Sequence, residues 1–107
     1  MQPHTLQSLC IFLLALLPLE VNAAPNFIRD IQPILETNCV RCHKQGKAKG
    51  DLRMETHSLM LEGGAEGEAI VPGKPGESEI IRRTHLRPID EGFMPDEGQA
   101  LKKNELD

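Results

Sequence analysis

Three side chains that can bind a cofactor lie together in the segment Cys39-Val40-Arg41-Cys42-His43. Two thiols three positions apart, followed directly by an imidazole, form the pattern by which a c-type haem is attached. The thiols of Cys39 and Cys42 would add to the two vinyl groups of the haem, and His43 would offer a ring nitrogen to the iron as proximal ligand. The spacing therefore predicts one covalently bound haem c.

Other uses of two closely spaced cysteines have less support. A structural zinc site needs four ligands, usually two such pairs, and the only other cysteine is Cys10, near the amino terminus. A redox dithiol of thioredoxin type follows a buried strand, whereas the residues before Cys39 have a helical pattern. A disulfide between Cys39 and Cys42 would close a very small loop and add little stability. Haem is favoured, with a redox dithiol or a metal as the alternatives.

A second axial ligand to the iron is usually a methionine or a histidine, and a methionine sulfur raises the reduction potential. Met94 is the favoured candidate because it lies in Gly92-Phe93-Met94-Pro95, where the proline restricts the preceding residue to an extended loop. The apolar surroundings of two other methionines favour gap-filling in the core, and two histidines have polar neighbours typical of the surface. These weaker candidates are Met54, Met60, His57 and His85. A histidine ligand or an open distal position remains an alternative.

The amino-terminal segment predicts export. The apolar run from Leu9 to Leu19 is shorter than the roughly 20 residues that span a bilayer, but it suits the hydrophobic region of a secretory signal. Val21-Asn22-Ala23 supplies small residues for cleavage, so we expect a signal peptide over 1–23 and a domain over 24–107. The leader has no Lys or Arg, which leaves an uncleaved anchor as the alternative. Export agrees with the haem motif, because covalent haem attachment takes place outside the cytoplasm, and the mature protein is expected to be periplasmic or extracytoplasmic without a membrane span.

Composition limits the mature domain to 84 residues. Of the 16 acidic residues only Glu20 would leave with the signal, so 15 acidic against 12 basic side chains give a net charge of −3. No basic stripe of a nucleic-acid-binding protein is present. Phe27 and Phe93 are the only aromatic residues of the domain, and a chain this small commonly needs a cofactor to complete its core.

Hydrophobic periodicity predicts short helices. Apolar residues from Phe27 to Leu35 follow one helical face, with Asn26 as a cap and Pro33 either kinking the helix or starting a new one. We expect this face to cover the haem edge and to contact other helices. Two further helices are predicted over 56–61 and 77–85, the second opening near Ser78.

All nine glycines lie between positions 46 and 98, so the middle of the chain is rich in loops. Segments 63–67 and 72–76 have turn composition, and the absence of Gly-Lys-Ser/Thr excludes a phosphate loop. No alternating apolar pattern indicates a sheet. The expected fold is therefore all-α, with short helices and long loops around one haem.

The sequence resembles the planctomycete-type cytochrome c domain, a class I-like module of exported proteins, over nearly the whole mature chain. The matching segments are 31–35, 39–43, 50–54, 63–64, 70–75, Ser78, 80–83 and 94–95. The resemblance implies thioether bonds at Cys39 and Cys42, His43 as the proximal iron ligand and Met94 as the distal one. It also implies that Pro72 lends a carbonyl to the proximal imidazole.

One departure from the family concerns the carboxyl end. Such domains close with a helix, typically containing a tryptophan, that would bury the face of Phe27, Ile31 and Leu35. Here Asn104-Glu105 has the composition of a helix start, and the sequence stops at Asp107. We therefore expect a domain that is incomplete at its carboxyl end and fused to further domains in a full-length form.

The function expected from these residues is electron transfer to an unidentified redox partner protein. Neither a nucleophile with an adjacent base nor a defined pair of carboxylates is present, so catalysis is not expected of this domain. The alternative is a haem-based ligand sensor or a peroxidase-like enzyme with an open distal site. A third possibility is a folding unit without haem.

Overall fold

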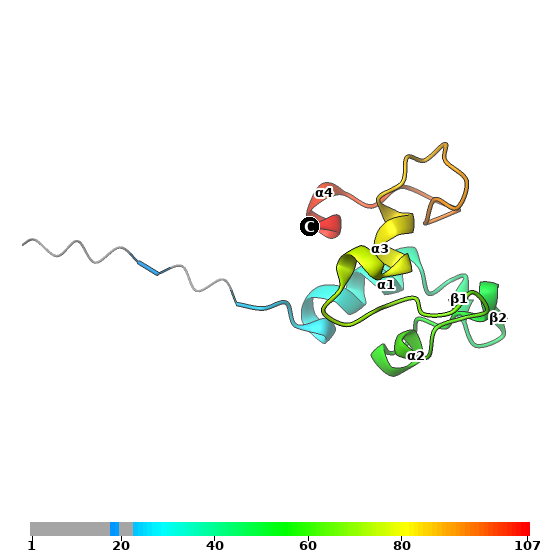
Figure 1. The fold of residues 1–107 in the computed structure, drawn as a ribbon, viewed down its shortest axis with the longest axis horizontal. Helices are drawn as coiled ribbons and strands as arrows, with labels where there is room; N and C mark the ends of the chain where they lie inside the picture. The colour runs from blue at the N-terminus through cyan, green and yellow to red at the C-terminus, as the bar shows by residue number, and fades with distance from the viewer. Residues whose placement is uncertain (1–17, 20–22) are drawn as a thin grey trace, which may run out of the picture.

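The computed structural model describes residues 18–19 and 23–107, a domain of short helices joined by loops (Figure 1). The predicted signal peptide over 1–23 lies almost entirely outside the described residues. The elements in chain order are the π-helix η1 (Phe27–Ile31), α1 (Gln32–Asn38), the strands β1 (His43–Lys44) and β2 (Lys47–Ala48), the 3-10 helix η2 (Lys49–Asp51), α2 (His57–Glu62), the 3-10 helix η3 (Pro75–Glu77), α3 (Glu79–Thr84) and α4 (Lys103–Leu106). Within the described part of the chain, no helix has the length and apolar character needed to cross a membrane.

The first two helices confirm that the predicted helical segment begins after Asn26 and is interrupted near Pro33. The Asn26 side chain accepts a hydrogen bond from the Arg29 backbone N–H at 2.9 Å and so caps η1. Pro33 is the second residue of α1, a position where its missing N–H costs no helical hydrogen bond. The helix therefore restarts around Pro33, one of the two outcomes that the sequence allowed.

The helices α2 and α3 also lie where the pattern placed them. The hydroxyl of Thr56 accepts a hydrogen bond from the Leu59 N–H at 3.2 Å and caps α2. Helix α3 begins directly after Ser78, but the Ser78 hydroxyl does not cap it. Instead the hydroxyl accepts from the Val71 N–H at 3.0 Å and contacts the Lys74 carbonyl at 3.0 Å, so it ties the preceding loop to the start of the helix.

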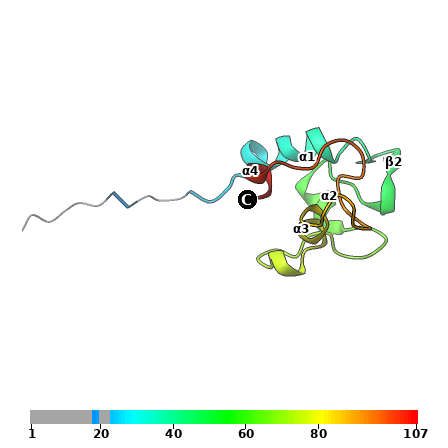
Figure 2. The same ribbon diagram turned by 90° about the horizontal axis from the view of Figure 1, so that it is seen from above.

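A small antiparallel hairpin was not predicted. Strands β1 and β2 pair His43 with Ala48 and Lys44 with Lys47, and Gly46 turns between them with a φ of +81°. Strands of two residues are too short to show an alternating pattern, which explains the omission. The domain is thus built from several short helices, as expected, with this hairpin added at the end opposite η1 (Figures 1 and 2).

The core is formed mainly by two methionines and a leucine. The buried cluster consists of Leu35 of α1, Met54 from the segment before α2, and Met60 of α2. Its composition confirms the interpretation of the two methionines as core residues. Partly buried side chains pack around this cluster: Phe27, Ile31, Cys39, Val40, Leu52, Ile70 and Ile80. Since Leu52, Met54 and Ile80 also line the cavity described below, core packing holds the walls of the candidate site.

Candidate functional site

A cavity of about 460 Å³ brings the predicted site residues together: Cys39, Cys42, His43 and Met94 all line it. Its volume falls within the roughly 300–1,000 Å³ typical of cofactor sites. Apolar side chains supply much of the remaining wall, including Leu52, Met54, Ala69, Ile80 and Pro95. Residues from the middle and from the carboxyl-terminal part of the chain therefore enclose one space next to the two thiols.

The cysteine motif continues directly from the end of α1. The N–H groups of Cys39 and Val40 donate to the carbonyl of Leu35 at 2.8 and 2.9 Å, and the Cys42 and His43 N–H groups donate to the carbonyl of Cys39 at 3.1 Å each. These consecutive turns fix the backbone of the whole motif. Both cysteines are free thiols, so no disulfide closes the short loop between them.

The imidazole of His43 has a backbone partner. Its Nδ1 lies 3.3 Å from the carbonyl oxygen of Leu52, and a proton on Nδ1 shared with that carbonyl leaves Nε2 free to bind a metal. The Met54 N–H donates to the His43 carbonyl at 2.8 Å, so the same segment also holds the His43 backbone. The assignment of this role to Pro72 is wrong, because the carbonyl beside the His43 ring belongs to Leu52, whereas Pro72 lines a different groove.

The surroundings of Cys39 do not favour redox chemistry of the dithiol itself. Burial, and to a lesser degree the neighbouring Cys42, raises the pKa of Cys39 to about 11. A nucleophilic cysteine of a redox pair needs a lowered pKa, so the raised pKa of Cys39 argues against a redox dithiol of the thioredoxin type. Among the described residues, moreover, no group of three His, Cys, Asp or Glu side chains is placed to hold a metal ion.

The geometry separates the candidates for the second axial ligand. Met60 lies in the core, and His57 and His85 are exposed, as predicted. Met54 is buried in the core and also lines the cavity. Its N–H donates to the His43 carbonyl, so Met54 belongs to the segment that holds the proximal ligand. Met94 comes from the long loop after α3, where its N–H donates to the Arg83 carbonyl at 3.2 Å and the next residue, Pro95, is buried. Met94 is thus the thioether that a separate segment brings to the cavity.

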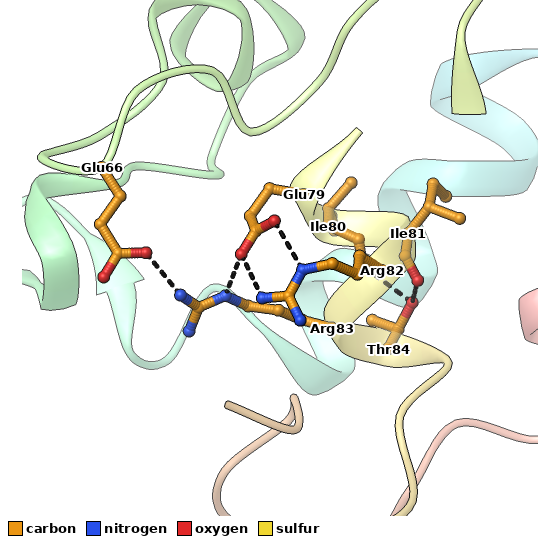
Figure 3. A network of polar contacts seen from close by, with 7 residues as sticks. All are labelled: Glu66, Glu79, Ile80, Ile81, Arg82, Arg83 and Thr84. Carbon is orange, nitrogen blue, oxygen red and sulfur yellow. Dashed lines mark hydrogen bonds and ion pairs between the residues drawn. The ribbon is translucent and has the colours of Figure 1, made fainter. Parts of the chain in front are cut away.

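A network of charged side chains borders the cavity, and the sequence reasoning did not identify it. The Arg83 guanidinium bridges Glu66 and Glu79, at 2.5 and 2.8 Å, and Arg82 also pairs with Glu79 (Figure 3). Hydrogen bonds from Arg82 and Arg83 lower the pKa of Glu79 to about 2. The pairs within α3 could have been found from their spacing of three and four residues. The link to Glu66 joins distant segments and left no such signal.

The apolar face of the first helices lies elsewhere. Phe27, Ile31 and Leu35 line a second groove of about 310 Å³, together with Met60 and Ile70. They are absent from the lining of the larger cavity, so the expectation that this face covers the haem edge is wrong. Helix α1 affects the site through its carboxyl end, which positions the motif.

These residues fit a c-type haem: two free thiols and an imidazole in one short segment, a thioether from another segment, and a largely apolar wall. Comparison with protein families gives a match to one described as planctomycete cytochrome C, over residues 39–98. That segment covers more than half of the chain and includes the motif and the Met94 loop. Searches among curated proteins and among solved structures gave no match.

Proposed function

The chain belongs to the planctomycete cytochrome C family, and from this membership, which implies binding of haem c, we propose that it is an exported electron carrier with one covalently attached haem. The observation that carries the proposal is the single cavity lined by Cys39, Cys42, His43 and Met94. Three of these residues lie within one turn, and the fourth comes from a loop that is distant in sequence.

Each residue has a distinct task in this proposal. The bound haem supplies an iron that accepts and returns one electron. Cys39 and Cys42 hold the group covalently, and His43 offers Nε2 while the Leu52 carbonyl orients its ring through Nδ1. Met94 occupies the distal position and raises the reduction potential. Apolar neighbours such as Leu52 and Ile80 line the cavity and would contact the apolar surface of the haem.

A filled distal position favours electron transfer over catalysis, because it leaves no coordination site for a substrate or a gas. The mature domain would work outside the cytoplasm, where haem attachment takes place, and would exchange electrons with a redox partner protein.

Covalent attachment is tested by expressing the full chain with haem-attachment machinery and staining the denatured protein for haem. We expect haem in the wild type and in the control V40A, which changes the motif between the cysteines, and none in the double variant C39A/C42A. Haem retained by C39A/C42A would contradict covalent attachment through these thiols. A wild type without haem, under conditions that load another c-type cytochrome, would contradict the function.

The distal ligand is tested with carbon monoxide on the ferrous protein. A Met94-ligated iron excludes carbon monoxide, so we expect binding by M94A but little by the wild type. A charge-transfer band of iron–methionine ligation in the ferric wild type, absent from M94A, provides the second measurement. Equal carbon monoxide binding by both proteins would instead support the ligand sensor or peroxidase-like alternative.

A further inference from the structure

The side chain of Arg41, one of the two residues between the motif cysteines, reaches a distant loop. Its Nη2 donates a hydrogen bond to the backbone carbonyl of Glu97, three residues after Met94. Both Arg41 and Glu97 line the large cavity. The guanidinium therefore joins the cysteine motif to the methionine loop, and both segments line the same cavity.

Two neighbouring features support this contact. Lys49, just after β2, places Nζ 3.9 Å from Glu97 Oε1, which adds an ion pair to the same residue. Gly98 has a φ of +93°, and a Cβ there would lie 2.6 Å from Arg41 Nη2. A side chain at position 98 would thus displace the guanidinium, so the glycine leaves the space that the contact requires.

The methionine loop has a second attachment on its other side. The Met94 N–H donates to the Arg83 carbonyl at 3.2 Å, which ties the loop to α3. Met94 is therefore anchored through its own N–H, and the Arg41 contact holds the chain three residues further on. Loss of the Arg41 contact leaves the chain beyond Met94 with only the weaker Lys49–Glu97 ion pair at this point.

We infer that Arg41 is a positioning residue that holds the Met94 loop next to the cysteine motif and so determines how readily the distal iron position opens. The inference rests on the proposed role of Met94. A hydrogen bond from a guanidinium is stronger than one between neutral groups, although the exposure of Arg41 weakens it. An external ligand can bind iron only in the open state, so its apparent affinity rises with the population of that state.

The test is a titration of the ferric, haem-loaded full-length protein with imidazole. M94A serves as the permanently open reference, and K47A is the matched control, since Lys47 is a cation of the adjacent hairpin that does not line the cavity. We expect R41A to bind imidazole about threefold to tenfold more tightly than the wild type. R41K keeps the positive charge but lacks the planar guanidinium, so its imidazole affinity should lie between those of R41A and the wild type. The affinity of K47A should equal that of the wild type.

The outcomes distinguish this inference from the proposed function. Equal imidazole affinity in R41A, K47A and the wild type, all weaker than in M94A, would overturn the role of Arg41 and leave Met94 as the ligand. If the wild type binds imidazole as tightly as M94A does, both the role of Arg41 and the role of Met94 as distal ligand would be overturned. If R41A does not retain haem, R41Q provides the same comparison, because it keeps a neutral donor but is too short to reach the Glu97 carbonyl.

Discussion

Ser78 offers the sharpest test of how the loop before α3 is held. Its side chain is buried, with only 4% of its surface exposed. The hydroxyl accepts a hydrogen bond from the Val71 N–H at 3.0 Å and donates to the Lys74 carbonyl at 3.0 Å. The substitution Ser78→Ala removes both bonds at once and leaves two backbone groups without these partners.

The expected cost follows from that loss. Removing one member of a buried hydrogen bond costs about 1–3 kcal/mol. Val71 is only half-buried, so water can reach part of the vacated position, and we expect the lower part of that range, about 1–2 kcal/mol. For a domain of this size each kcal/mol lowers the melting temperature by roughly 4–8 °C. The S78A variant should therefore melt roughly 5–15 °C below the wild type.

Thermal unfolding of the haem-loaded protein, followed by circular dichroism, measures this difference. The control is S58A, the same substitution at an exposed position of α2, where we expect a change of no more than about 0.5 kcal/mol. A melting temperature of S78A equal to that of S58A would refute the reasoning, since it would mean that the buried hydroxyl contributes no net stability.

Two further predictions concern charge and backbone conformation. The pKa of Glu79 is lowered from 4.5 to about 2 in the folded state, so its stabilising effect is present above pH 4.5 and is lost as the pH falls toward 2. Acid unfolding of E79Q should therefore depend less on pH in this interval than that of the wild type, and parallel curves would contradict the assignment. G63A should be less stable than G46A by at least about 1 kcal/mol. Both glycines have positive φ, but a Cβ at Gly63 would lie 2.4 Å from the Gly67 carbonyl oxygen, whereas the space at Gly46 is open. Urea unfolding of the two variants measures the difference, and equal stability would exclude the steric cause.

The features that depend on neighbouring residues could be predicted from the sequence. Asn26 and Thr56 cap their helices because a side-chain oxygen two or three residues before a free N–H can accept its hydrogen bond. Pro33 marks the restart of the helix for an equally local reason. The motif at Cys39 was recognisable because covalent haem attachment demands a fixed spacing.

The features that depend on distant contacts could not be predicted in the same way. Ser78 was expected near a helix start and lies there, but its hydroxyl bonds to the preceding loop. The contact from Arg41 reaches a carbonyl 56 residues away, and every residue except proline offers the same carbonyl and N–H. Met54 was predicted mainly as a core residue and ranked as a weaker ligand candidate, and the structure places it both in the core and in the cavity lining. These contacts depend on which distant segments the fold brings together, so the types of the residues alone do not predict them.

The acceptor beside the His43 imidazole is a backbone carbonyl, and this changes which mutations can affect the proximal ligand. Replacing the side chain of Leu52 leaves its carbonyl in place, so no codon change at that position deletes the hydrogen bond outright. The path of this backbone is constrained by Gly64, where a Cβ would lie 2.5 Å from the Gly50 carbonyl oxygen and 3.2 Å from the Leu52 nitrogen. Inherited variation that disturbs the histidine can thus arise at a glycine that bears no functional group, while a side-chain substitution at the residue supplying the acceptor leaves that carbonyl in the chain.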